Sequence, residues 1–247
     1  MSAPLLLRIS DSGCATSPRV SLSSMAAITL SQRKELDGPL LGVALAAALA
    51  AAVLALYIAG HPYIPEDAAI ERGVQSTSWG PLVLTFPVFS FIGDAKGAVL
   101  EAIVFVLILV FNRRAWILAA AASLTALWYV LLNHLVNRPR PTTAQVLQVT
   151  EHPGASSFPS GHTMFIVTLS AVLMLGLGRR FLPRRARPIG WALVVLIVAA
   201  NAVARVYVGA HWPTDVIEAI LVSVAWLTVV ASVKRISDRA LADPHGG

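Results

Sequence analysis

Six apolar stretches, separated by polar and basic loops, constrain this chain more than any other feature of its sequence. A helix needs about 20 residues to cross ~30 Å of hydrocarbon, and the second and fourth stretches reach that length only with their polar flanks. Only 13% of the residues are charged, about half the fraction of a soluble domain. The sequence therefore predicts an all-α integral membrane bundle of six transmembrane helices. The stretches are residues 39–60, 97–111, 115–136, 162–177, 189–208 and 215–233.

The segments outside these stretches are polar or only moderately apolar. Residues 1–37 are Ser-rich and weakly patterned, which is typical of a flexible cytoplasmic tail, and Met25 is a possible start site. We expect residues 38–236 to form the membrane domain and residues 237–247 to form a cytoplasmic C-terminal tail. Residues 82–92 are apolar but contain a proline, so we expect an interfacial or re-entrant segment there.

The lysines and arginines alternate between the two ends of the predicted spans. Fourteen of the nineteen fall in the two tails and in the loops after the second and fourth spans. The positive-inside rule therefore places both termini in the cytoplasm and the other loops outside. Membrane orientation therefore explains the net charge of +6. Nucleic-acid binding is not needed to explain it, because the loops show no surface that combines basic and aromatic residues. The single cysteine, Cys14, excludes an internal disulfide and a thiolate metal site.

Three polar clusters fall in the predicted outside loops. Each alone has an ordinary interpretation, such as a helix end or an N-cap, but their convergence on one membrane face favours a functional site. Residues 138–141 read Arg-Pro-Arg-Pro, residues 159–162 read Pro-Ser-Gly-His, and the third cluster comprises Arg205, His211 and Asp215.

These residue types match the chemistry of a phosphate group. Arginine forks bind phosphate oxygens in a bidentate manner, and residues 160–162 lie where a helix begins, with free backbone amides that can bind an anion. His211 and Asp215 can pair, so that the carboxylate fixes one ring nitrogen and leaves the other free to attack. His162 can then serve as a general acid.

With these motifs the chain resembles the type 2 phosphatidic acid phosphatase family, whose fold is shared with vanadium haloperoxidases. The family pattern is Lys, six residues, Arg-Pro; then Pro-Ser-Gly-His; then Ser-Arg, five residues, His, three residues, Asp. The resemblance covers about residues 80–233. It implies that His211 is a nucleophile that forms a phosphohistidine, that Asp215 orients it, and that His162 is the general acid and later the base. It also implies a phosphate cradle without metal or other cofactor, formed by Arg140, Ser160, Gly161 and Arg205.

Two positions depart from the family pattern. Asn133 stands where the family has its lysine, and Ala204 replaces the serine before Arg205. Asparagine brings no charge, so we expect Arg138 or Lys96 to supply the missing cation, with Asn133 and Arg138 both contacting the phosphate.

The sequence thus predicts a metal-independent hydrolase in the cell membrane whose partners are the bilayer and a lipid substrate. The active site would face the extracytoplasmic side. Phosphatidic acid, phosphatidylglycerol phosphate and polyprenyl diphosphates are all family substrates, and the residues do not choose among them. Two alternatives stay open: a catalytically weak or silent lipid-binding homologue, and a membrane transporter built on the same spans.

Overall fold

The computed structural model describes residues 36–93, 95–151 and 154–240, and the regular secondary structure of that part is helical throughout. Nearly all of the predicted N-terminal tail, with Met25, lies outside the described residues. The start of the predicted C-terminal tail belongs to a helix, α12 (Lys234–Ala240). The division into tails and membrane domain stays a prediction.

Five helical stretches are long and apolar enough to cross a membrane. The stretch expected as the second span forms α5 (Ala95–Phe111), which has 17 residues and falls short of that length. The count of six spans therefore stays a prediction. The five stretches are Gly38–Gly60, Arg113–Val136, Gly161–Phe181, Arg184–Tyr207 and Pro213–Ser232.

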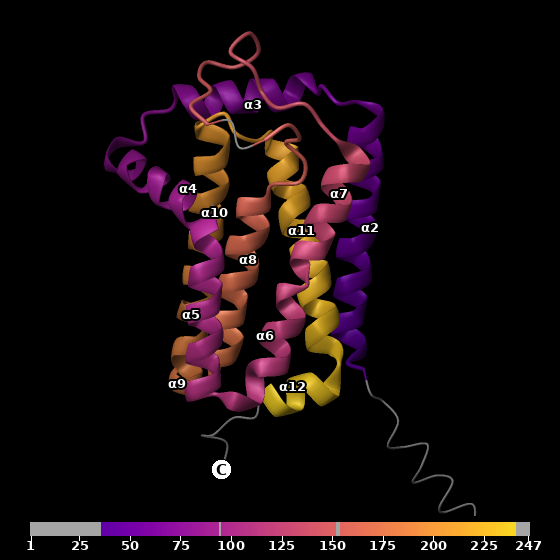
Figure 1. The fold of residues 1–247 in the computed structure, drawn as a ribbon, viewed down its shortest axis with the longest axis vertical. Coiled ribbons are helices and arrows are strands. Elements are labelled where there is room, and N and C mark those ends of the chain that lie inside the picture. The colour runs from indigo at the N-terminus through magenta and orange to yellow at the C-terminus, as the bar shows by residue number, and fades with distance from the viewer. Residues whose placement is uncertain (1–35, 94, 152–153, 241–247) are drawn as a thin grey trace, which may run out of the picture. The chain divides into compact units, whose positions relative to one another are not determined.

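Several of these stretches contain more than one helical element. The third expected span, for example, is divided at Leu124 into two α-helices. The apolar segment at residues 82–92 is helical as well, and it runs into α5 at an angle (Figure 1). In chain order the elements are α2 (Gly38–Gly60), α3 (Pro65–Ser76), η1 (Gly80–Thr85), α4 (Phe86–Gly93), α5, η2 (Arg113–Ala115), α6 (Trp116–Ser123), α7 (Thr125–Val136), α8 (Gly161–Leu173), the π-helical η3 (Met174–Gly178), α9 (Arg179–Phe181), η4 (Arg184–Ala186), α10 (Arg187–Tyr207), α11 (Pro213–Ser232) and α12.

Local sequence explains where the long helices begin. The carboxylate of Asp37 caps α2 by accepting a hydrogen bond from the backbone N–H of Leu40 at 3.2 Å. The N–H of Asp37 itself donates to the carbonyl of Ser232 at 2.8 Å, which joins the start of α2 to the end of α11. A proline in the first turn of α11 needs no hydrogen-bond partner there.

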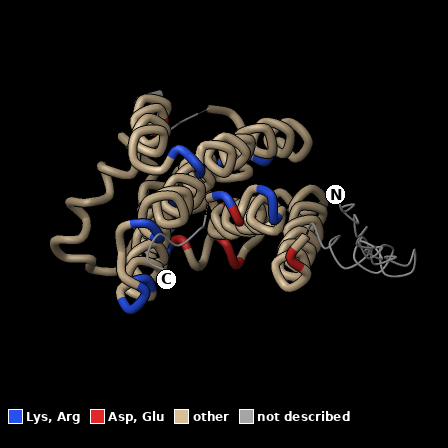
Figure 2. The backbone as a smooth tube through the Cα atoms, turned by 90° about the horizontal axis from the view of Figure 1, so that it is seen from below, with Lys and Arg blue, Asp and Glu red and all other residues tan. Residues whose placement is uncertain are grey.

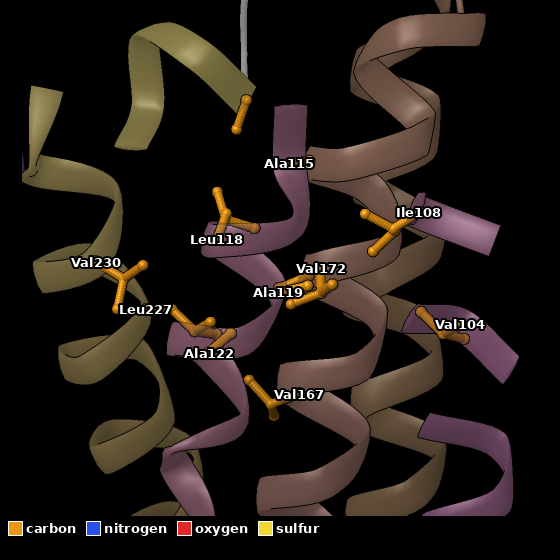
Figure 3. Packing of buried hydrophobic residues seen from close by; sticks show 12 residues of the cluster. Val104, Ile108, Ala115, Leu118, Ala119, Ala122, Val167, Val172, Leu227 and Val230 are labelled. Atoms are coloured by element: carbon orange, nitrogen blue, oxygen red, sulfur yellow. The ribbon is translucent and has the colours of Figure 1, made fainter. Parts of the chain in front are cut away.

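Packing in the bundle is dominated by small and branched side chains. Helix α11 lies along α2, and α8 contacts both α10 and α11. Ala119 and Ala122 of α6 come close to Val167 and Val172 of α8 in the largest buried cluster (Figure 3). Large apolar side chains remain exposed along α2 and α10, as expected for helices that face lipid rather than water. They include Leu45, Leu49, Leu56, Ile189, Leu193 and Leu196.

The two ends of the bundle differ in chemistry. Helices α9 and α12 lie at the end opposite α3 (Figure 1), and these two helices carry five of the basic residues. Figure 2 views the bundle from that end, with lysine and arginine in blue. The loops that carry the three sequence motifs lie at the α3 end (Figure 1), so one end of the bundle is basic and the other holds the motifs.

Candidate active site

His211 lies in the short loop between α10 and α11. The turn depends on Gly209, which has a φ of +72°, and a Cβ at this position would lie 2.4 Å from the carbonyl oxygen of Gln148. The buried indole of Trp212 fixes the other side of the loop, because its Nε1–H donates to the carbonyl of Pro139 at 2.9 Å. The third motif is thereby attached to the loop that carries the first.

The ring of His211 is buried, with only 3% of the residue exposed. Its Nδ1 lies 2.7 Å from the carbonyl oxygen of Ser157, which can only accept a hydrogen bond, so Nδ1 carries the proton and Nε2 carries the lone pair. Burial lowers the pKa of His211 well below its ordinary value, and the nearby Arg140 and Arg205 lower it further. The ring is therefore neutral near pH 7, with a nucleophilic Nε2.

Asp215 does not take the position that the sequence predicted for it. The expected partner of the His211 ring was this carboxylate, but the Ser157 carbonyl occupies Nδ1. The reason is local: Asp215 is the third residue of α11, and its carboxylate turns back to accept the N–H of Trp212 at 2.9 Å as a capping group. Asp215 therefore contacts the loop that carries His211 through the backbone N–H of Trp212, the residue after His211, rather than through the imidazole ring.

Arg138 contacts Trp212 and Asp215, two residues of the third motif region that follow His211. Arg138 is only 1% exposed. Its Nη1 donates to the carboxylate of Asp215 and its Nη2 donates to the carboxylate of Asp67, both at 2.7 Å. The guanidinium also stacks over the Trp212 ring, 5.5 Å from its centroid, and Nη1 contacts the hydroxyl of Thr214. The sequence predicted a phosphate ligand here, whereas the structure shows an arginine engaged by two buried carboxylates.

Arg140 reaches the loops on both sides of His211. Its Nε donates to the carbonyl of Gly154 at 2.7 Å and its Nη2 to the carbonyl of Ser156 at 2.6 Å, while Nη1 donates to the carbonyl of Ala210. This arginine therefore bridges the loop before α8 and the loop before α11, next to the nucleophilic ring.

Arg205, near the end of α10, is fully buried and contacts groups that the sequence analysis did not single out. Its Nη1 donates to the hydroxyl of Ser90 at 2.7 Å, and its Nη2 forms an ion pair with Glu151 at 2.5 Å. Within the described part of the chain, its Nε–H has no hydrogen-bond partner. The Nε2 of His162 lies 3.3 Å from the carbonyl oxygen of Ser90, so one turn of α4 contacts both motif residues.

The Ser-Gly-His motif begins α8, as expected from the sequence. The hydroxyl of Ser160 caps the helix by accepting the N–H of Thr163 at 3.4 Å, and Ser160 itself is fully buried. A Cβ on Gly161 would lie 3.0 Å from the ring of Tyr129, so a glycine allows α8 to approach α7 this closely. The first amides of the helix lie at the motif end of the bundle, where an anion is stabilised.

Asn133, in the position of the family lysine, supports the loop before α8. Its Nδ2 donates to the carbonyl of Phe158 at 3.0 Å. The other cation expected to compensate for the lysine was Lys96, whose side chain lies outside the part that the structure describes.

Four contributing residues carried no usable signal in the sequence. Ser90 lies in an apolar segment, Glu151 and Ser157 lie in an irregular loop, and Asp67 lies on a polar surface helix. None belongs to a motif, because their contacts arise from segments far apart in the chain. Only the fold brings them to the three motifs.

Comparisons with known proteins match the part of the chain that carries the three motifs. The model of the PAP2 superfamily matches residues 114–238, which include all three motifs. Decaprenylphosphoryl-5-phosphoribose phosphatase of Mycobacterium tuberculosis is 31% identical over 123 residues, covering 49% of this chain and 63% of that protein. Undecaprenyl-diphosphatase BcrC of Bacillus subtilis is 29% identical over 108 residues, covering 42% and 51%. The chain thus spans less than two thirds of the length of these curated relatives.

One solved structure shares the fold. It is the first transmembrane PAP2 type phosphatidylglycerolphosphate phosphatase from Bacillus subtilis, with a TM-score of 0.63 and 20% sequence identity over 76% of this chain and 93% of that one. This likeness supports a membrane-embedded fold, as the long apolar helices do. With the superfamily match over half of the sequence, it leads to one conclusion: this chain is a multi-pass membrane member of the PAP2 superfamily.

Proposed function

We propose that this protein hydrolyses a lipid phosphate or diphosphate through a phosphohistidine on His211, at the extracytoplasmic face of the membrane. The observation that carries the proposal is the His211 ring: Nδ1 is held by the Ser157 carbonyl, and the ring lies close enough to Arg140, Arg205 and His162 for their charges to affect it. A neutral imidazole beside two arginines is suited to attack an anionic phosphorus centre.

The reaction takes two displacement steps. In the first, the lone pair on Nε2 of His211 attacks phosphorus, the bond from phosphorus to the leaving oxygen breaks, and His162 donates a proton to that oxygen. In the second, His162 accepts a proton from water as the water oxygen attacks the phosphohistidine. Inorganic phosphate leaves, and the lone pair returns to Nε2, which restores the starting protonation state of both histidines.

The arginines and the α8 amides would stabilise the charge on the phosphoryl oxygens during both steps. Arg205 has one buried N–H without a protein partner among the described residues, which is a donor available to a phosphate oxygen. Arg140, Ser160 and Gly161 complete the proposed cradle. Because these groups supply the electrostatic stabilisation, we expect turnover to need no metal ion.

Three further residues have positioning roles in this proposal. Arg138 holds Asp215, whose carboxylate accepts the N–H of Trp212, so this pair holds the loop that carries the His211 ring. Asn133 holds the carbonyl two residues before Ser160. These roles replace the direct phosphate contacts that the sequence suggested for Arg138 and Asn133.

A lipid substrate follows from the membrane fold and from the relatives. Two curated relatives are named as phosphatases of decaprenylphosphoryl-5-phosphoribose and undecaprenyl diphosphate, so a polyprenyl substrate is the first to test. The extracytoplasmic orientation rests on the charge distribution among the loops.

The test is phosphate release from a panel of lipid phosphates by detergent-purified protein, with excess chelator present. We expect turnover by the wild type, and an acid-labile, base-stable radioactive label on the protein. His211→Ala should abolish both, whereas Asp215→Asn should retain some turnover because the attacking atom remains. Label that persists in His211→Ala would place the nucleophile elsewhere, and activity that requires added Mg²⁺ would contradict the histidine mechanism. A silent homologue would release no phosphate from any lipid in the panel.

A further inference from the structure

The carboxylate of Glu151 forms an ion pair with Arg205, the buried arginine of the proposed phosphate cradle. The Oε2 of Glu151 lies 2.5 Å from Nη2 of Arg205, and the hydroxyl of Ser90 accepts a hydrogen bond from Nη1 of the same arginine at 2.7 Å. The Arg205 side chain is 0% exposed, whereas that of Glu151 is 28% exposed. The partly exposed carboxylate therefore occupies a guanidinium nitrogen that a phosphate oxygen would otherwise bind.

Glu151 is ionised in this position. Burial raises its pKa, but hydrogen bonds from Ser90 and Arg205 outweigh burial and hold the pKa of Glu151 below its ordinary value. His162 also lies near enough for its charge to favour the ionised carboxylate. A substrate phosphate must therefore compete with an anion for Arg205.

The residue before Glu151 is anchored, which limits how far the carboxylate can move. The N–H of Thr150 donates to the carbonyl of Val208 at 2.9 Å, and its hydroxyl contacts the same oxygen at 3.2 Å. A glutamate displaced from Arg205 by side-chain rotation alone stays within a few ångström of the bound phosphate. It would then face whatever group the phosphate is attached to.

We infer that Glu151 is a specificity-determining residue, which disfavours diphosphates and favours phosphate monoesters that carry a hydroxyl group next to the ester bond. This inference rests on the proposed function of the same site. A second phosphate beside the first would meet a fixed negative charge at short range, and repulsion between two unit charges at about 6 Å reduces binding roughly ten- to a hundredfold in a partly buried site. A hydroxyl in the same place would donate a hydrogen bond to the carboxylate.

The test compares Glu151→Gln and Glu151→Ala with the wild type on three substrates, in the same detergent. The substrates are phosphatidic acid, which has no neighbouring hydroxyl; phosphatidylglycerol phosphate, which has one; and undecaprenyl diphosphate. Differences between lipid tails cancel when each variant is compared with the wild type. Glu66→Gln, which changes an exposed carboxylate on α3, is the matched control.

In both Glu151 variants, kcat/KM for undecaprenyl diphosphate should rise at least roughly tenfold relative to phosphatidic acid, and inhibition by orthovanadate should tighten. Only Glu151→Ala should also lose preference for phosphatidylglycerol phosphate over phosphatidic acid, because glutamine keeps an acceptor oxygen. Glu66→Gln should leave all ratios unchanged.

Two results would overturn the inference while leaving the proposed function intact: unchanged substrate ratios in both Glu151 variants, or an equal loss of activity on all three lipids with weaker vanadate inhibition. Failure of the proposed function has a different signature, because the wild type would then release phosphate from none of the three substrates.

Discussion

At the residue scale, the histidine ring shows how neighbours rather than a single partner set reactivity. The Ser157 carbonyl fixes the tautomer of His211, while burial and two arginines disfavour its protonated form. A directly paired carboxylate would raise the pKa of the ring. A neutral carbonyl also orients the ring, but it raises the pKa less. The observed arrangement therefore keeps this ring, the proposed nucleophile, unprotonated in mildly acidic medium.

This arrangement predicts a pH dependence of activity. Protonation removes the lone pair of His211, so kcat/KM should fall only at a pH well below the ordinary histidine pKa of 6.5. Arg140→Ala removes a cation that lowers this pKa, so the acid limb of the profile should move to higher pH even though overall activity falls. Both proteins are measured on the same substrate, so that the titration of the substrate phosphate affects the two profiles equally. An acid limb that stays in place in Arg140→Ala would contradict the proposed electrostatic coupling.

A second residue-scale prediction concerns Arg138. Replacing it with alanine leaves Asp67 and Asp215 buried without their shared cation, and breaking such a pair costs about 3–5 kcal/mol. Arg138→Ala should therefore lower both the apparent melting temperature in detergent and the activity. Asp67→Asn should also lower the melting temperature. Arg114→Ala, at an exposed arginine, is the control. An Arg138→Ala protein with wild-type stability and a raised KM alone would instead indicate direct phosphate binding.

At the element scale, the sequence predicted most helices but not the joints between them. Apolar runs longer than 18 residues gave four of the five long stretches near their observed positions, and the helix start at Ser160 followed from the capping residue. The sequence showed that the second stretch is short, but the break at Leu124 was not predicted, because composition does not show where a continuous apolar run divides into two helices. The position of α3 against α10 and α11 depends on contacts between segments far apart in the chain, which no local pattern encodes.

The joint that matters most to the site is the loop at Gly209. Gly209→Ala would place a methyl group 2.4 Å from the Gln148 carbonyl, in a backbone conformation that costs about 1–2 kcal/mol for other residues. We expect a large loss of turnover and a lower melting temperature. Gly80→Ala separates the two effects, since Gly80 also has a positive φ but no atom within 4 Å of the added carbon. Equal losses in both variants would show that strain alone, and not the clash beside His211, is responsible.

At the scale of the whole molecule, the three motifs were predictable as a group because alternating spans place their loops on one face. Their roles were less predictable. Arg140, Arg205 and His162 lie near enough to His211 for their charges to affect its pKa, whereas Arg138 and Asn133 bind protein groups, and the contact of Glu151 with Arg205 was not predicted. The difference is physical: a motif specifies residue types at fixed spacing, but the partners of a buried charge come from whichever distant segments the fold places beside it.

The orientation of the bundle gives the last prediction. The basic residues of α9 and α12 lie at the end opposite α3 and the motif loops (Figure 1), so the positive-inside rule predicts that the site faces the extracytoplasmic side. In a Cys14→Ser background, Thr143→Cys and Arg185→Cys put single thiols on exposed positions at the two ends. A membrane-impermeant maleimide applied to intact cells should label the first and not the second, and permeabilised cells should show both. Labelling of the Arg185→Cys protein in intact cells would reverse the orientation, and the substrate would then have to be reached from the cytoplasm.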